Sequence, residues 1–133
     1  MQVLIVDDNI PFVQRLVRLL HDGGIQEGIC ISSDYDGALA AMDNCQPDVV
    51  LLDINLPGKN GLAVLQQIRK SGIRPAVIML TNHVDDYYRD RCRELGTDYF
   101  LDKSNDFSLV PGIIHQLKEN EHPPILSTNG LRN

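Results

Sequence analysis

Short, uninterrupted runs of apolar residues alternate along the chain with longer stretches in which apolar residues recur every three or four positions. The continuous runs at 3–6, 49–52 and 76–80 are rich in β-branched residues, which is typical of strands covered by helices on both faces. Two further runs, at 28–32 and 98–101, complete a set of five predicted strands. The run at 28–32 is mixed in polarity and suits the edge of a sheet.

Helical periodicity fills the segments between the predicted strands. Four predicted helices occupy residues 11–24, 33–44, 60–72 and 84–96, and a fifth begins near Val110, because Pro111 fits only a first helical turn. The strict alternation predicts an α/β fold with a doubly wound parallel sheet and right-handed crossovers. We expect five strands in the order 2-1-3-4-5 and five helices, a flavodoxin-like arrangement.

Length and composition are those of a single globular domain. The chain has 133 residues, of which 43% are hydrophobic and 23% charged. We expect the domain over residues 1–119, with 120–133 as a tail or the start of a linker, since that end has two prolines and no periodicity. The net charge is −6 and no lysine or arginine run is present, so we expect no direct nucleic acid binding by this chain.

The lack of a recognisable targeting signal and the spacing of the cysteines favour a cytoplasmic protein that is not associated with a membrane. No apolar run approaches the roughly 20 residues of a membrane span, and Met1 leads directly into the first predicted strand, so no signal peptide is expected. The three cysteines, Cys30, Cys45 and Cys92, have no metal-binding spacing. We therefore expect all three as reduced thiols.

Polar residues stand at the carboxyl ends of four predicted strands. Asp7 and Asp8 follow the first strand, Asp53 follows the third, Thr81 ends the fourth, and Lys103 follows the fifth. Taken singly, each has another explanation, as a helix cap, a turn residue or a solvated lysine. In the order 2-1-3-4-5, with adjacent strands about 4.8 Å apart, they would meet at one edge of the sheet.

Carboxylates this close together repel each other, at a cost of about 4 kcal/mol for one pair at 4 Å and an effective dielectric near 20. Such a cluster calls for a cation, and carboxylate oxygens without histidine or cysteine favour Mg²⁺. Mg²⁺ retains water and binds phosphate, and a carboxylate can itself accept a phosphoryl group. Asp53 is therefore the predicted phosphoacceptor, with Thr81 and Lys103 contacting the phosphoryl oxygens.

Four motifs occur in order along the chain: "LIVDDN", "DVVLLDINLPGKNG", "VIMLTN" and "DYFLDK". With them the chain resembles the receiver domains of bacterial two-component response regulators, from Gln2 to about Glu119. The resemblance implies roles for the following residues: Asp53 as phosphoacceptor, Asp8, Asp53 and the Asn55 backbone carbonyl as Mg²⁺ ligands, Asp7 through a metal-bound water, Thr81 and Lys103 on the phosphoryl oxygens, Phe100 as the switch aromatic, and Pro57 and Gly61 in the turn.

Three positions depart from the family pattern. Asn82 replaces the small residue that usually follows the threonine, His83 comes next, and Ser104 stands where proline commonly follows the lysine. Asn82 and His83, together with Asn55, are candidates for tuning the rate of phosphate loss; a solvated loop histidine is the other interpretation of His83. A cis bond before Ser104 would cost about 2.5–4 kcal/mol, so the sequence leaves that peptide open.

The resemblance implies a phosphorylation-dependent signalling switch, phosphorylated by a sensor histidine kinase, a phosphotransfer protein or a small phosphodonor. The signal would be read on the face of the fourth helix, fifth strand and fifth helix, by a downstream protein, an output domain or a second copy forming a homodimer. Such a chain is no enzyme beyond its own phosphorylation and dephosphorylation.

Two other functions are weighed against this one. An Asp-nucleophile phosphatase of the haloacid dehalogenase kind needs a second carboxylate where Asn55 stands. A pseudo-receiver, a binding module that never takes phosphate, fits poorly with the complete acidic set. The sequence leaves open whether the chain acts alone or as part of a longer regulator.

Overall fold

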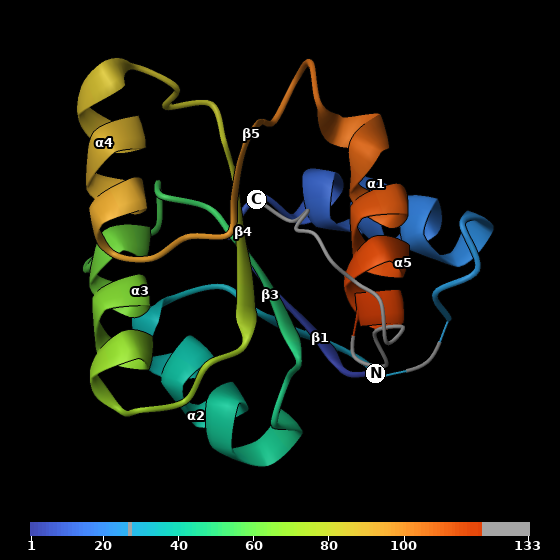
Figure 1. The fold of residues 1–133 in the computed structure, drawn as a ribbon, viewed down its shortest axis with the longest axis horizontal. Coiled ribbons are helices and arrows are strands. Elements are labelled where there is room, and N and C mark those ends of the chain that lie inside the picture. The colour runs from blue at the N-terminus through green and yellow to red at the C-terminus, as the bar shows by residue number, and fades with distance from the viewer. Residues whose placement is uncertain (27, 121–133) are drawn as a thin grey trace.

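The computed structural model describes residues 1–26 and 28–120. Its sheet is formed by five parallel strands: β1 (Val3–Val6), β2 (Ile29–Ser32), β3 (Val49–Leu52), β4 (Ala76–Thr81) and β5 (Tyr99–Asp102). The strand order is β2-β1-β3-β4-β5, with β2 at one edge (Figure 1). This order confirms the predicted fold class.

Five α-helices alternate with the strands in the described residues: α1 (Ile10–Asp22), α2 (Tyr35–Cys45), α3 (Gly61–Lys70), α4 (Asp86–Glu94) and α5 (Val110–Asn120). Pro111 lies in the first turn of α5, as predicted, after a short 3₁₀ helix, η1 (Phe107–Leu109), that the sequence pattern did not indicate. None of these helices combines the length and apolarity needed to cross a bilayer. Residues 121–133 of the expected tail lie outside the described residues.

Side-chain caps set where the first four helices begin. The capping side chains, which accept a hydrogen bond from a first-turn amide, belong to Asn9, Asp34, Asn60 and Asp85. Each such cap stabilises its helix by about 1 kcal/mol. Because Asn9 caps α1, the alternative that Asp7 or Asp8 serves as that cap is wrong, and both carboxylates remain available at the end of β1.

The sheet divides the interior into two apolar layers. In β1, Val3 and Ile5 pack with α1 and α5, whereas Leu4 and Val6 pack on the opposite face. Figure 1 shows α1 and α5 on one side of the sheet, with α2, α3 and α4 on the other. Because both faces are covered, the central strands are apolar at every position and only their ends can hold polar chemistry.

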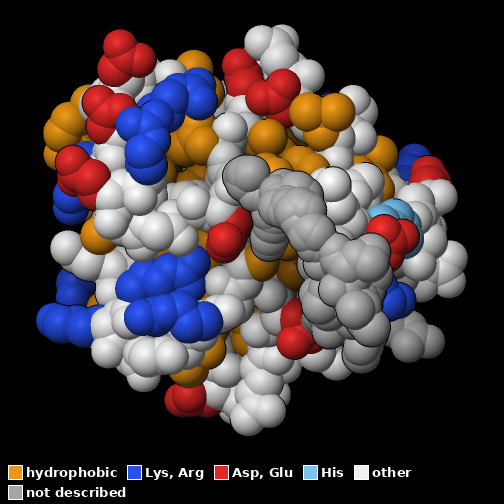
Figure 2. Space-filling model, in the orientation of Figure 1, with side chains coloured by type: hydrophobic (Ala, Val, Ile, Leu, Met, Phe, Trp, Pro, Cys, Tyr) orange, Lys and Arg blue, Asp and Glu red, His pale blue; other side chains and the backbone are white. Residues whose placement is uncertain are grey.

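Charges of both signs are interspersed on the face of the molecule shown in Figure 2. In Figure 2 the basic side chains lie in separate groups with acidic side chains near them, not as one continuous basic face. On α4, Arg91 pairs with Glu94 at 2.7 Å and Arg93 with Asp90 at 3.1 Å. Exposed pairs of this kind add little stability, but they balance the charge of the helix locally.

Two of the cysteines form a disulfide, so the expectation of three reduced thiols is wrong. Cys30 in β2 is bonded to Cys45, the last residue of α2. The crossover brings their Cα atoms to 6.7 Å although the residues are 15 apart in sequence. That spacing carries no motif, so only the fold reveals the pair. Cys92 is free and buried, in agreement with the prediction for it.

We expect reduction of the Cys30–Cys45 bond to lower thermal stability. A crosslink that closes a loop of this size stabilises the fold by about 3 kcal/mol, chiefly by restricting the unfolded chain. For a domain of this size the melting temperature should fall by roughly 10 °C on adding dithiothreitol, measured by differential scanning calorimetry. The double variant Cys30→Ser/Cys45→Ser should melt at the lower temperature with or without reductant. Identical melting of oxidised and reduced wild type would contradict the prediction.

Candidate functional site

The backbone register places the predicted site residues at one edge of the sheet. Val6 of β1 is paired with Leu52 of β3, and the Asp53 amide donates to the Val6 carbonyl at 3.0 Å. Asp7 and Asp53 therefore leave adjacent strands at the same level. On the other side, the Lys103 amide donates to the Thr81 carbonyl at 2.9 Å, which brings the end of β5 to the same edge.

Three carboxylates converge there. Asp7, Asp8 and Asp53 each offer an oxygen within 4.8 Å of the others. Asp7 and Asp53 are only 3% and 5% exposed, whereas Asp8 is open to solvent. The amides of Asn9 and Asn55 donate to Oδ1 of Asp7 and Asp53, at 2.9 and 3.2 Å. Each buried carboxylate is thus oriented by an amide two residues further along the chain.

Lys103 reaches into this cluster from the end of β5. Its Nζ lies 2.8 Å from Asp7 Oδ2 and 3.0 Å from Asp53 Oδ2, and its side chain is buried. The long lysine side chain therefore spans the distance from β5, as the strand order predicted. Three carboxylates against one ammonium leave two negative charges, the amount that one divalent cation balances.

The pKa values of Asp7 and Lys103 reflect both their removal from water and the charges beside them. Burial raises the pKa of Asp7, and the charge of Asp53 adds to this, while hydrogen bonds from Lys103 and the Asn9 amide oppose it. Burial alone would lower the pKa of Lys103, but its hydrogen bonds and charge interactions with Asp7 and Asp53 outweigh that effect and raise it. The lysine is therefore a fixed positive charge at neutral pH.

The donor set fits a hard divalent cation. In the described residues the cluster offers oxygens from three carboxylates and contains neither histidine nor cysteine. Oxygen-only sets of this kind suit Mg²⁺ better than zinc. Because Asp8 is exposed, the cation would keep water on its open side, which Mg²⁺ favours because it sheds water reluctantly.

The loop after β4 holds the next group of candidates. Thr81 is fully buried, and its Oγ1 accepts a hydrogen bond from the His83 amide at 3.1 Å. Asn82 is exposed, and its Oδ1 accepts a hydrogen bond from Ser104 Oγ at 3.5 Å, which links the loops after β4 and β5. No peptide bond in the described residues is cis, so the Lys103–Ser104 bond is trans.

The turn after Asp53 requires glycine at its end. A Cβ at Gly61 would overlap the carbonyl oxygen of Asp53, and the Gly61 amide donates to the Ile54 carbonyl at 2.8 Å. Gly58, in the same turn, has a φ of +72°, a conformation that glycine adopts without strain. The Pro57–Gly61 turn thus folds α3 tightly against the end of β3.

Phe100 does not join the carboxylates. It lies in β5 on the face shared with α2, α3 and α4, half-buried and in register with Met79. The Arg89 guanidinium stands over its ring, 4.7 Å from the centroid. The predicted residues therefore form two groups: the charged cluster with Thr81 at the strand ends, and Phe100 beneath α4.

One neighbour of the cluster was not singled out by the sequence. The ring centroid of Phe12 lies 4.4 Å from Lys103 Nζ. In the sequence Phe12 is one of several apolar positions on the first helix, and only its place in the first turn after the aspartate pair distinguishes it.

Comparison with known proteins assigns the family. The family model of the response regulator receiver domain matches residues 3–115, so the chain belongs to that family. The general function of these domains in two-component systems is phosphorylation signalling. Nothing in these matches supports the haloacid dehalogenase alternative, since they are to regulators and not to an enzyme family.

Individual relatives agree with this assignment. The chain is 36% identical to the transcriptional regulatory protein CpxR of Klebsiella pneumoniae, over 84% of this chain and 47% of the relative. It is 25% identical to the DNA-binding transcriptional activator EvgA of Escherichia coli, over 89% and 57%. A crystal structure of the signal receiver domain of a DNA-binding response regulator from Colwellia psychrerythraea matches with a TM-score of 0.82 and 26% identity, over 90% and 98%. The chain spans about half the length of the curated relatives it matches.

The raised pKa of Asp7 predicts a pH-dependent stability that Asp7→Asn removes. The folded protein binds a proton at Asp7 at a pH where the unfolded chain, with a pKa near 3.8, does not. Wild type should therefore gain stability relative to Asp7→Asn as the pH falls from about 7 to about 4, by about 1.4 kcal/mol for each tenfold by which folding strengthens proton binding at Asp7. Urea unfolding in EDTA across this range measures the difference.

Asp43→Asn, on the exposed surface of α2, controls for the loss of one negative charge outside the cluster. A difference between wild type and Asp7→Asn that stays constant with pH, or that shrinks as the pH falls, would contradict the assignment of a raised pKa to Asp7.

Proposed function

We propose that this chain is a phosphorylation-dependent switch in which Asp53 accepts a phosphoryl group from a sensor histidine kinase, a phosphotransfer protein or a small phosphodonor. The observation that carries the proposal is the position of the Asp53 carboxylate. It is buried, it is one of three carboxylates that converge within 4.8 Å, and its Oδ2 is paired with Lys103 Nζ at 3.0 Å. A carboxylate held in this way is a nucleophile with positive charge already beside it.

Asp8 and Asp53 would bind Mg²⁺ directly, with the Asn55 backbone carbonyl as a further ligand and Asp7 acting through a metal-bound water. When bound, Mg²⁺ supplies positive charge that offsets the charge of the phosphoryl oxygens. In the transfer, an Asp53 oxygen forms a bond to phosphorus as the bond from phosphorus to the donor breaks. The Lys103 ammonium already donates a hydrogen bond to Asp53 Oδ2, so it would move only a short way to reach a phosphoryl oxygen.

Thr81 and the loop residues have separate roles in the proposal. The Thr81 hydroxyl, which now accepts from the His83 amide, would donate to a phosphoryl oxygen. Asn55 and Asn82 are exposed and His83 is half-buried, so water reaches this side of the site. We assign these three residues to the rate of phosphate loss, in which water attacks phosphorus and the bond from phosphorus to the Asp53 oxygen breaks, releasing inorganic phosphate. This hydrolysis and its own phosphorylation are the only chemistry proposed for the chain.

The signal would be read on the α4-β5-α5 face. Movement of Thr81 toward the phosphoryl group leaves space beside β4 for Phe100 to turn inward, away from Arg89. The surface around Tyr87, Tyr88 and Tyr99 would change with it. Tyr88 packs against the same core cluster as Phe100, and its ring centroid lies 5.1 Å from that of Tyr87. A downstream protein, an output domain or a second copy in a homodimer would recognise that change.

The relatives support a role within a larger regulator. EvgA is described as a DNA-binding transcriptional activator, and it is nearly twice as long as the matched region. We propose that the receiver domain, residues 1–119, controls such an output domain or a separate partner, and itself binds neither nucleic acid nor membrane. We propose the cytoplasm as its location.

Phosphorylation of Asp53 is tested by intact mass. With Mg²⁺ and acetyl phosphate, the mass of the wild-type protein should rise by one phosphoryl group, about 80 Da. Asp53→Asn lacks the nucleophile and should show no increase, and EDTA should abolish the increase in wild type. Asp43→Asn is the matched control and should be modified like wild type. Equal modification of Asp53→Asn and wild type would refute the assignment.

The switch is tested by two-dimensional NMR with beryllofluoride, a phosphate mimic, under saturating Mg²⁺. We expect large shifts both in the site loops and across residues 84–112, because Phe100 transmits the change to α4 and β5. The two conformations need differ by only a few kcal/mol for this response. In Phe100→Leu the site loops should still respond, whereas the response in α4 should weaken. Shifts confined to the site loops of wild type would exclude this mechanism.

A further inference from the structure

The Lys103 ammonium has a third side that neither carboxylate occupies. Its hydrogen bonds go to Asp7 and Asp53, yet an ammonium has three N–H donors. The centroid of the Phe12 ring lies 4.4 Å from Nζ, within the range of a cation–π contact. Phe12 and Lys103 are both buried, so the contact is shielded from water, where such contacts are strongest.

The Phe12 ring is itself held in place. The backbone amide of Phe12 donates a hydrogen bond to the capping side chain of Asn9 at 3.1 Å. This bond fixes the first turn of α1 directly after the aspartate pair. The ring meets Phe107 of η1 in an edge-to-face contact, with centroids 5.5 Å apart and planes at 62°. Phe107 follows Lys103 closely in the chain, so the ring and the ammonium are fixed by the same two segments.

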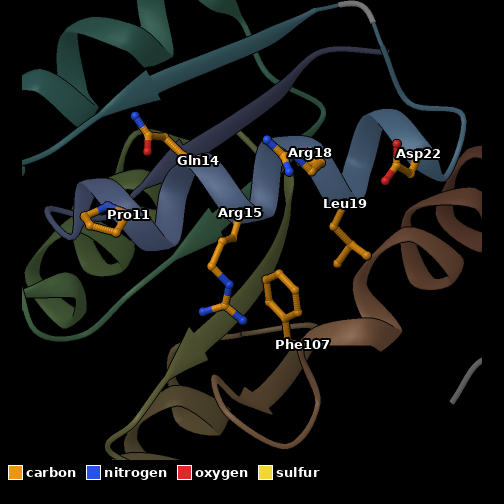
Figure 3. Close-up of a pocket in the computed structure, with 7 residues that line it drawn as sticks. All are labelled: Pro11, Gln14, Arg15, Arg18, Leu19, Asp22 and Phe107. Carbon is orange, nitrogen blue, oxygen red and sulfur yellow. The ribbon is translucent and has the colours of Figure 1, made fainter.

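A second cation, the Arg15 guanidinium, lies over the ring of Phe107 on the side nearer the surface (Figure 3). The Arg15 guanidinium lies 4.9 Å from the Phe107 ring centroid, and Figure 3 shows the two side chains adjacent at a surface groove between α1 and η1. The groove has a volume of about 500 Å³ and is also lined by Leu19. The order ammonium, Phe12, Phe107, guanidinium thus runs from the buried site to the surface.

We propose that Phe12 is a positioning residue that holds the Lys103 ammonium against Asp53 Oδ2; this rests on the proposed phosphotransfer to Asp53. The ring attracts the ammonium without a directional hydrogen bond. It therefore stabilises the charge while leaving the ammonium free to turn toward a phosphoryl oxygen. Water or a polar side chain in this place would instead bind the third N–H and compete with the phosphoryl group.

The kinetic test compares Phe12→Leu, Phe12→Met and Phe12→Tyr in the whole chain, with Mg²⁺ and acetyl phosphate. Leucine and methionine keep most of the apolar volume but lack a π face, so phosphorylation of Asp53 should slow about tenfold. Tyrosine restores the face and should restore most of the rate. Leu16→Val is the control, because Leu16 is buried one turn further along α1 and its aliphatic side chain offers no π face to an ammonium.

A second measurement needs no phosphodonor. In wild type, the Hε protons of Lys103 should show an upfield ring-current shift in ¹H–¹³C spectra, because Nζ stands over the ring. This shift should vanish in Phe12→Leu and Phe12→Met and return in Phe12→Tyr. The same spectra report whether each variant is folded. If Phe12→Leu is not folded, Phe12→Met is used for the comparison.

The outcomes separate the two proposals. If wild type takes no phosphate but shows the ring-current shift, the proposed phosphotransfer fails while the contact itself stands. If wild type is phosphorylated and the folded non-aromatic variants react at the wild-type rate, the positioning role is overturned. It is overturned equally if Leu16→Val slows as much as they do, since loss of packing would then explain the effect, or if tyrosine restores neither rate nor shift.

Discussion

The buried ion pairs between Lys103, Asp7 and Asp53 are the constraint on which the site depends. Removing three charged groups from water is costly, and the cost is offset only if each charge finds partners of good geometry. The register of β1 and β3, the amides of Asn9 and Asn55, and the reach of Lys103 from β5 meet that requirement together. A sheet order that separated β1 from β3 would leave these carboxylates without the same neighbours.

The architecture explains why the chemistry stands where it does. Apolar layers on both faces leave no polar position within the central strands, so charged groups can collect only where strands end. The turn after β3 adds a second condition, because Gly61 must approach the Asp53 backbone closely enough that no side chain fits. The result is a rigid frame around Asp53, with solvent reaching the cluster on the side of Asp8.

The sequence predicted the frame better than the contacts. Continuous apolar runs, capping residues and the order of elements sufficed for the sheet, and the strand-end aspartates with Lys103 sufficed for the cluster. The sequence did not predict the Cys30–Cys45 disulfide, because the spacing of the two cysteines is set by the path of a crossover and not by a local pattern. Phe12 was missed for a related reason. As an apolar residue on a helix it has the pattern of ordinary core, and only the folded structure shows the Lys103 ammonium at its ring.

The disulfide also bears on how the molecule behaves in a crowded solution. β2 is an edge strand, and its Ile31 side chain is 53% exposed. Unpaired edge strands invite intermolecular strand addition, which proteins limit by covering or distorting the edge. Here the covalent tie from Cys30 to the end of α2 holds a helix beside that edge. Reducing this bond would therefore release the tie at the β2 edge, which is the edge of the sheet opposite β5 and Phe100.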